Sequence, residues 1–322
     1  MNTAERLKNI DVGHVSFSEP LSSHCSWRIG GPADALVQPD SEEQILRLLE
    51  FVRGEGIPLL VIGRGTNILF PDGGIRGVVL KLGRRFSGFS FSGARVRAKG
   101  GVWVPRLVRN IADAGLSGME HASGIPGSLG GLVTMNGGSL RRSVGENILS
   151  VDAVSHAGEM RTFSREECDF SYRHSFFQCS GTRDEERWII LGALLELTPG
   201  DRGAIRREQL RILEERRVKF PHHQPNCGSV FSNVPAVYDL AGPPGRIVEE
   251  TGLKGKQVGG AQVSFCHANF IVNMGGATAR DVLSLIGEVR RRVYDRIGVW
   301  LDCEVRYADE RGVLVPASEA CL

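Results

Sequence analysis

The chain has 322 residues, of which 41% are hydrophobic, and this is enough for two or three compact domains with ordinary cores. Its 39 basic and 37 acidic residues leave a formal charge of only +2, which argues against a nucleic-acid binder or a membrane-surface protein. No apolar run is long enough to span a bilayer, and the charged start lacks a signal-peptide core, so we expect a cytoplasmic protein.

The cysteines and the paired arginines do not by themselves indicate a specific function. Seven widely spaced cysteines without a C-x-x-C pair predict reduced thiols, while a zinc site from Cys266, His267 and Cys303 stays open as an alternative. The arginine runs are expected on solvated helix or loop faces. They are Arg84-Arg85, Arg141-Arg142, Arg206-Arg207, Arg216-Arg217 and Arg290-Arg291-Arg292.

The first half of the chain alternates helical and extended patterns. Ser41 and Gln44 have the spacing of a capping box, and the helix that they predict ends at Gly54 and Gly56. An amphipathic helix is also predicted around 107–112, before Gly115. The strands predicted here lie at 59–62, 78–82 and 94–98.

The second half continues the mixed pattern. A basic helix is predicted at 205–219, after a Pro199-Gly200 linker, and Thr278 with Asp281 can cap a later helix. Strands are predicted at 148–154, 188–197 and 303–307. These patterns predict an α+β protein with an N-terminal segment at 1–20, one unit at 21–198 and another at 199–322.

A glycine turn follows the predicted strand at 59–62. Gly63 and Gly65 allow positive φ and the close approach of a ligand to backbone N–H groups, so this turn can hold a diphosphate. Most glycine pairs after strands are only turns, and that alternative stays open. The turn is not the dinucleotide fingerprint, because Ile68 takes the place of the third glycine and no helix clearly follows.

A second glycine-rich segment runs from about Met119 to Gly138. It is too bare of side chains to pack a core by itself, and it suits a flat or anionic ligand. Ser128 and Thr134 would serve as hydroxyl donors, together with exposed N–H groups at a helix start. The alternative is a long tight loop without a ligand.

Ordered sequence blocks extend over nearly the whole chain. They are Trp27-Arg28-Ile29-Gly30-Gly31-Pro32-Ala33-Asp34, the Gly63 turn, Gly124-Ile125-Pro126-Gly127-Ser128, Tyr172-Arg173-His174-Ser175, Cys227-Gly228-Ser229-Val230-Phe231, Gly252-Leu253-Lys254-Gly255, Gly259-Gly260-Ala261-Gln262-Val263, His267-Ala268-Asn269-Phe270 and Glu304-Val305-Arg306. In this order they resemble the UDP-N-acetylenolpyruvoylglucosamine reductases. The short stretch from Arg173 to Ser229 is similar to the shorter of the family's two types, which lacks a tyrosine-loop insertion and leaves the residue that closes over the substrate open.

The resemblance implies an FAD-binding domain of the vanillyl-alcohol-oxidase (PCMH) type, with two α+β lobes, at 21–198, and an α+β substrate domain at 199–322. It implies non-covalent FAD, NADPH as the electron donor, and reduction of UDP-N-acetylglucosamine enolpyruvate to UDP-N-acetylmuramate for peptidoglycan. A monomer without metal, nucleic acid or membrane insertion is expected. The residues expected to bind FAD are Gly63, Arg64, Gly65, Thr66, Asn67, Ser123, Gly124, Ile125, Gly127, Ser128, Gly130, Thr134 and Asn136.

The resemblance also implies catalytic roles. Hydride addition to the enolpyruvyl methylene builds negative charge on the adjacent carbon and the carboxylate, which the guanidinium of Arg173 would stabilise. Ser229 would protonate that carbon, and Glu304 would assist. Without the resemblance, Arg173 and Glu304 are typical of surface ion pairs, and Cys227 is a competing acid.

Substrate contacts are implied at Tyr172, Lys219, Asn233 and Lys254. The chain departs from the family pattern at Ser232 and at Val234, which displaces Pro235, and both places adjoin the expected diphosphate contacts. Two other functions remain open. One is a different FAD-dependent oxidase or dehydrogenase with the same domain type, and the other is a non-catalytic sensor of flavin or nucleotide sugar.

Overall fold

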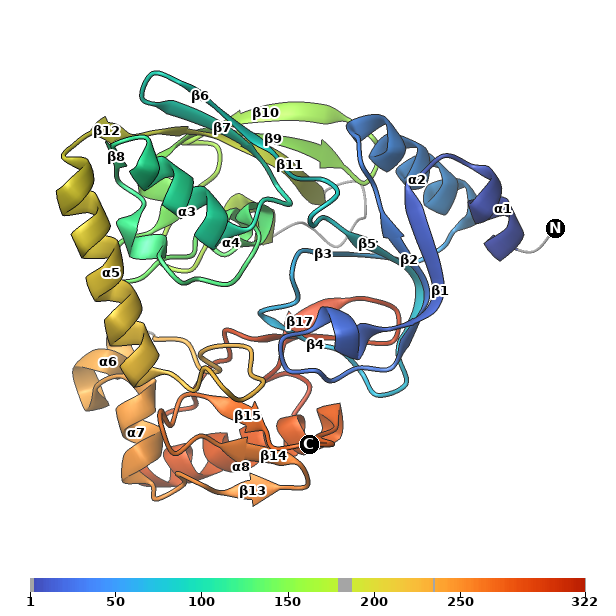
Figure 1. Cartoon of the computed structure of the whole chain (residues 1–322). Helices are drawn as coiled ribbons and strands as arrows, with labels where there is room; N and C mark the ends of the chain where they lie inside the picture. Colours follow the sequence, from blue (N-terminus) through green and yellow to red (C-terminus); the bar gives the residue numbers. More distant parts are fainter. Residues whose placement is uncertain (1–2, 179–186, 234, 322) are drawn as a thin grey trace. The chain divides into compact units, whose positions relative to one another are not determined.

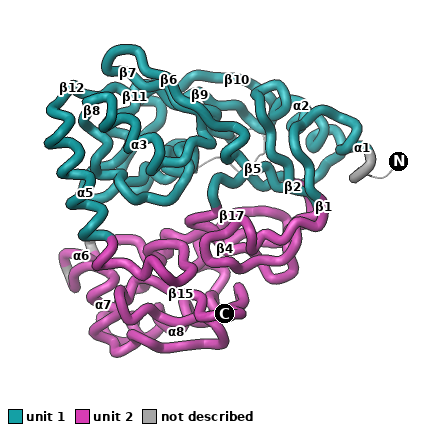
Figure 2. Tube along the Cα trace, viewed as in Figure 1, with its two compact units in different colours: residues 1–16, 35–64, 79–216 teal, residues 17–34, 65–78, 217–322 magenta. Residues whose placement is uncertain are grey.

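The structure is a computed structural model and describes residues 3–178, 187–233 and 235–321. The chain forms two compact units (Figure 2). The first contains 1–16, 35–64 and 79–216, and the second contains 17–34, 65–78 and 217–322. Each unit therefore collects segments that lie far apart in the sequence. These units do not coincide with a division between residues 198 and 199, and the assignment of those two ranges to FAD and to substrate stays a prediction.

A five-stranded sheet organises the first unit (Figure 1). All its neighbouring strands are antiparallel, in the order β10-β9-β11-β7-β6. Its strands are β6 (Phe89–Ser92), β7 (Arg95–Lys99), β9 (Ile148–Ser155), β10 (Met160–Ser164) and β11 (Trp188–Glu196). A short pair, β8 (Leu116–Ser117) with β12 (Thr198–Pro199), adjoins the start of α5 (Arg202–Lys219).

Two helices cover one face of this sheet, α3 (Val104–Asp113) and α4 (Leu129–Thr134) (Figure 1). Leu107 and Ile111 of α3 are almost fully buried in the same core as Leu129 and Val133 of α4. The glycine-rich segment therefore adds its apolar residues to a core that it shares with α3 and the sheet, and it does not pack a core by itself. These apolar residues bury against the sheet because helical spacing places them on one face.

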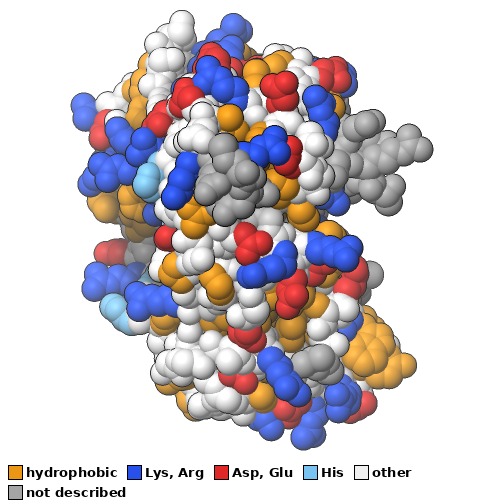
Figure 3. Space-filling view, turned by 90° about the vertical axis from the view of Figure 1, so that its right-hand side faces the viewer, with side chains coloured by type: hydrophobic (Ala, Val, Ile, Leu, Met, Phe, Trp, Pro, Cys, Tyr) orange, Lys and Arg blue, Asp and Glu red, His pale blue; other side chains and the backbone are white. Residues whose placement is uncertain are grey.

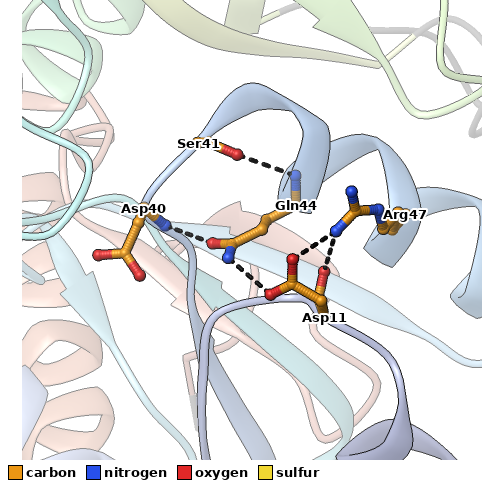
Figure 4. A network of polar contacts seen from close by, with 5 residues as sticks. All are labelled: Asp11, Asp40, Ser41, Gln44 and Arg47. Carbon is orange, nitrogen blue, oxygen red and sulfur yellow. Dashed lines mark hydrogen bonds and ion pairs between the residues drawn. The ribbon is translucent and has the colours of Figure 1, made fainter.

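The N-terminal part of the first unit is joined to α2 (Glu42–Glu55) by polar contacts (Figure 4). The Ser41 side chain accepts from the N–H of Gln44 and caps the helix, as predicted. The Gln44 amide donates to Asp11 and accepts from the N–H of Asp40, while Arg47 forms an ion pair with Asp11. These contacts fix the entry to α2, which follows α1 (Thr3–Asn9) along the chain.

A four-stranded sheet has the order β1-β2-β5-β3. Its strands are β1 (His14–Pro20), β2 (Pro32–Gln38), β5 (Ile75–Lys81) and β3 (Leu59–Ile62). β3 ends directly before the Gly63 turn, as the apolar run predicted. A short strand, β4 (Ile68–Leu69), follows the turn in place of a helix.

The second unit contains two three-stranded sheets. In one, β4 pairs in parallel with β16 (Arg306–Ala308), which pairs with β17 (Leu314–Pro316). In the other, β13 (Gln257–Val258), β14 (Ala261–Val263) and β15 (Ile271–Asn273) are antiparallel and adjoin α8 (Ala279–Ile297). The predicted Thr278 and Asp281 capping box of α8 is confirmed. The unit also contains α6 (Pro235–Ala241) and α7 (Pro244–Glu250).

Two expectations about local structure are wrong. The last strand begins at Arg306 rather than at Cys303, because Cys303 forms an isolated bridge with Phe231 and the chain bends through Glu304. Glu304 therefore lies outside the strand that contains Arg306. Arg216 and Arg290 are not on solvated faces, since both are half-buried and donate to backbone carbonyls.

Charges of both signs are interspersed on the face shown in Figure 3, as the balanced composition suggested. None of the helices in the described ranges is long and apolar enough to cross a membrane.

Candidate active site

The two glycine-rich segments meet within the first unit. A Cβ atom at Gly63 would lie 2.0 Å from the Ser128 hydroxyl, so only glycine fits there without displacing the serine. Ser128 is the N-cap of α4 and accepts from the N–H of Gly131. The sequence placed both segments in one binding site, and the structure brings Gly63 and Ser128 into contact.

The Gly63 turn presents free backbone donors. Within the described residues, no hydrogen bond is donated by the N–H groups of Gly63, Arg64, Gly65 or Thr66. Gly65 has a φ of +61°, and a Cβ there would lie 2.0 Å from the His24 carbonyl oxygen. Consecutive free N–H groups in such a turn form an anion-binding concavity, so the turn fits a diphosphate.

The start of α4 differs from expectation. The N–H groups of Leu129 and Gly130 donate to the carbonyls of Val102 and Gly100, so the first N–H groups of this helix are already occupied. The Thr134 hydroxyl donates to the Gly130 carbonyl, and it must give up that bond to donate to a ligand. The expectation of exposed N–H groups at this helix start is therefore wrong.

Unpartnered polar atoms lie just before this helix instead. The Ser123 hydroxyl and the Nε2 atom of His121 are buried and have no hydrogen-bond partner among the described residues. The N–H groups of Gly127 and Ser128 also donate to no described group. Buried polar atoms are normally satisfied, so this orphan set indicates a ligand that is polar at this position.

Arg173 lies beside the same glycine-rich segment. Its guanidinium donates to the Gly138 carbonyl over 3.1 Å, and Asn136 donates to the Ser171 carbonyl over 2.7 Å. Both Asn136 and Arg173 have positive φ, +39° and +54°, which costs energy for a residue other than glycine. This strained geometry positions the guanidinium next to residues expected to bind FAD, while Tyr172 keeps an exposed ring.

Arg216 of α5 is a neighbour that the sequence did not single out. Its guanidinium donates to the carbonyl of Gly124 over 3.3 Å, and burial together with the charge of Arg173 lowers its pKa. The first unit thus gathers two guanidinium groups near the glycine-rich segment. The sequence indicated a basic pair at 216–217, but helical spacing alone could not show which of the two arginines is buried.

Ser229 and Glu304 are brought together within the second unit. The N–H of Glu304 donates to the carbonyl of Val230, directly after Ser229, over 2.9 Å. The Asn67 side chain donates to the Glu304 carbonyl over 3.1 Å, and the Asn67 carbonyl accepts from Arg306. Asn67, Glu304 and Val230, which follows the proposed proton donor, are therefore linked by one side-chain and two main-chain hydrogen bonds that also include Arg306.

Cys227 is unsuited to the acid role that the sequence left open. It is 3% exposed, and burial raises the pKa of its thiol well above the ordinary value. A thiol that holds its proton so firmly is a weaker acid than an exposed one.

His267 lies near the two lysines that are expected to bind substrate. In the sequence it stood out only as part of a block that resembles the family. Burial and the positive charges of Lys219 and Lys254 lower the pKa of His267 to about 4. Nδ1 of His267 accepts from the N–H of Asn269, which requires an unprotonated nitrogen. Lys254 also forms an ion pair with Glu249 over 2.7 Å.

Two predicted sites remain, Asn233 and the alternative zinc site. The side-chain oxygen of Asn233 is buried without a partner among the described residues, which fits a ligand contact. Cys266, His267 and Cys303 do not form a metal site, and no cluster of three or more candidate metal ligands occurs in the described ranges.

Comparison with known proteins decides the family. Residues 33–164 match the FAD binding domain family, and residues 220–308 match the C-terminal domain of UDP-N-acetylenolpyruvoylglucosamine reductase. UDP-N-acetylenolpyruvoylglucosamine reductase 1 of Corynebacterium glutamicum is 45% identical over 91% of this chain and 86% of its own. The chain belongs to the UDP-N-acetylenolpyruvoylglucosamine reductase family.

Other relatives agree with this membership. The reductase of Heliobacterium modesticaldum is 45% identical over 93% of this chain and 92% of its own. The crystal structure of the Thermus caldophilus reductase matches with a TM-score of 0.75 and 30% identity, over 91% of this chain and 98% of that one. The predicted family, the α+β fold class with its FAD domain, and the FAD-dependent oxidoreductase activity are confirmed.

Proposed function

We propose that this FAD-dependent reductase takes electrons from NADPH and reduces UDP-N-acetylglucosamine enolpyruvate to UDP-N-acetylmuramate for peptidoglycan. The observation that carries the proposal is the contact network of Asn67, Val230 and Glu304, which links the FAD turn to Ser229 and Glu304. The enzyme acts as a monomer in the cytoplasm, without nucleic acid or membrane insertion.

The residues present fit FAD. Free N–H groups in the Gly63 turn suit the diphosphate, and the orphan hydroxyl of Ser123 suits a polar atom of the cofactor. The remaining predicted contacts are proposed for the same cofactor. They are Arg64, Gly65, Thr66, Asn67, Gly124, Ile125, Gly127, Ser128, Gly130, Thr134 and Asn136. When bound, FAD would supply hydride-transfer chemistry between NADPH and the enolpyruvyl group.

Arg173 stabilises the negative charge that develops on the substrate carboxylate. Its guanidinium is permanently charged and planar, and its contact with Gly138 holds it in place. Arg173 thereby favours the intermediate, which carries additional negative charge at this position, over the bound substrate, and this lowers the barrier.

Ser229 supplies the proton to the carbon next to the carboxylate. A serine hydroxyl is a weak acid, so it needs a strongly basic carbanion and a partner that stabilises its charge. Glu304, whose backbone is bonded to Val230, assists in supplying that proton. Both residues are half-buried, which limits competition from water.

Substrate binding is proposed for Lys219, Lys254, Asn233 and Tyr172. The two lysines bring positive charge suited to a diphosphate, and they share the neighbourhood of His267. Asn233 has a buried side-chain oxygen that can accept from the nucleotide sugar.

The test follows the flavin spectrum of the purified protein. NADPH should bleach the flavin, and the enolpyruvyl nucleotide should restore its colour. In Ser229→Ala, bleaching should persist while recovery slows by roughly 10²-fold or more, because only protonation of the carbanionic intermediate is lost. The matched control is Ser90→Ala, an exposed serine of β6, which should behave as the wild type.

Three other outcomes would contradict the proposal, and each would indicate a different kind of protein. A colourless protein that stays inert after FAD addition would end the proposal. Vigorous oxygen consumption with a simple alcohol or sugar would indicate an oxidase with the same FAD domain. Unchanged flavin recovery in Ser229→Ala would indicate that the serine has no role, as expected of a non-catalytic sensor.

A further inference from the structure

Two buried thiols lie together beneath the FAD turn, within the second unit. Cys25 is 6% exposed and its sulfur lies 3.2 Å from the Ile68 carbonyl oxygen. Cys227 is 3% exposed, and its sulfur lies 3.6 Å from the same oxygen and 3.7 Å from that of Gly65. Two sulfurs that share one acceptor are close neighbours, although the residues stand 202 positions apart in the sequence.

The two thiols differ in acidity. A hydrogen bond from Cys227 lowers the pKa of Cys25, whereas burial raises the pKa of Cys227. Two adjacent thiols can be joined by oxidation, because a sulfenic acid formed on one sulfur is within reach of the other. Among the described residues two other thiols are buried, Cys168 and Cys303, and burial raises their pKa values to about 12, so they are expected to stay protonated.

We propose that Cys25 and Cys227 form a redox-sensitive modification site that hydrogen peroxide converts reversibly into a disulfide. The Cys25 thiolate attacks one peroxide oxygen, the O–O bond breaks, and Cys25 becomes a sulfenic acid while hydroxide leaves and takes up a proton. The Cys227 sulfur then attacks the Cys25 sulfur as the Cys227 proton passes to the departing oxygen, the S–O bond breaks, and a second water leaves. The two sulfurs together lose two electrons, and the peroxide gains them.

The linkage would act on the candidate active site. A disulfide draws the sulfurs to bonding distance and removes the S–H donors that face the Gly65 and Ile68 carbonyls. Cys227 also stands two residues before Ser229, and its sulfur contacts the Ser26 hydroxyl over 3.2 Å. Oxidation should therefore disturb the FAD turn and the serine loop together, and slow turnover.

The test uses the FAD-loaded protein with Cys266→Ser, because Cys266 is exposed and would react with peroxide first. After hydrogen peroxide treatment, alkylation and digestion, peptides containing Cys25 and Cys227 should be linked, and the intact protein should be lighter by two hydrogens. Dithiothreitol should reverse both changes. Turnover should fall by roughly tenfold on oxidation and recover on reduction, because a small displacement at an active site is costly.

Matched variants separate this pair from the other thiols. Cys25→Ser and Cys227→Ser should each abolish the linked peptide, and Cys303→Ser should retain it. Free Cys25 and Cys227 after peroxide treatment, or unchanged turnover in the linked protein, would overturn the proposal. The peptide measurement needs no variant of the pair to fold. The activity arm rests on the proposed function, and failure of that function would appear as inactivity of the reduced protein as well.

Discussion

Gly63 lies so close to Ser128 that a Cβ on the glycine would meet the serine hydroxyl at 2.0 Å. The serine cannot yield freely, since its hydroxyl caps α4 by accepting from Gly131. The contact joins the turn after β3 to the start of α4, two segments expected to bind the same cofactor. A substitution at Gly63 therefore tests the FAD site directly.

Gly63→Ala should weaken FAD binding by at least tenfold. The new methyl group must displace the Ser128 hydroxyl, which costs about 1 kcal/mol for the lost cap and moves the free N–H groups of the turn. The measurement is flavin content after dialysis, together with the midpoint of thermal unfolding. Gly54→Ala is the control, because a Cβ at Gly54 in α2 meets nothing within 4 Å.

The same prediction can be checked as a double-mutant cycle. In a Ser128→Ala background the hydroxyl is absent, so Gly63→Ala should cost clearly less than it does in the wild type. Equal losses in both backgrounds would show that the glycine is needed for another reason.

Arg173→Lys should lower kcat by about 10² to 10³-fold while flavin content stays normal. Lysine keeps the positive charge but lacks the planar fork that can bind a carboxylate through two hydrogen bonds. Steady-state kinetics with the enolpyruvyl nucleotide measure the effect. Arg165→Lys, at an exposed position, should match the wild type, and a normal kcat for Arg173→Lys would remove the arginine from the chemistry.

Glu304→Gln should slow reoxidation of the reduced flavin by the substrate by roughly 10²-fold, because the amide cannot accept or relay a proton as a carboxylate does. The contacts made by the main chain of residue 304 with Val230 and Asn67 do not involve the carboxylate, so the fold should persist. Stopped-flow absorbance separates this step from reduction by NADPH. Slow reduction with normal reoxidation would contradict the assigned role.

His267 should make the protein less stable in acid. Burial and the charges of Lys219 and Lys254 lower its pKa from 6.5 to about 4, so the unfolded chain binds more protons between these values. Stability is therefore complete above pH 6.5 and falls as the pH drops towards 4, with a slope below about 1.4 kcal/mol per pH unit after solvent screening. Urea unfolding at pH 7 and pH 5 measures the fall.

His267→Gln should lose less stability than the wild type between these two pH values. Its amide oxygen can still accept from the N–H of Asn269, but it does not titrate. An equal fall in both proteins would assign the acid sensitivity to other groups.

Much of the local structure could be predicted from the sequence. The caps at Ser41 and Thr278 were correct because a cap depends on residues within one turn of the helix. The last strand was placed too early, since pairing with β4 decides where it starts, and β4 is far away in the sequence. The burial of Arg216 was missed because the residue that it contacts, Gly124, is also far away in the sequence.

The sequence by itself determined the family, the order of the blocks and which residue types are available for the chemistry, because these depend on identity and local spacing. Only the tertiary structure decided that Gly63 contacts Ser128, that Glu304 is bonded to Val230, and that Cys25 and Cys227 share one carbonyl. Such contacts join residues tens to hundreds of positions apart. They form because burial of apolar surface brings distant segments together, and no short-range pattern records that outcome.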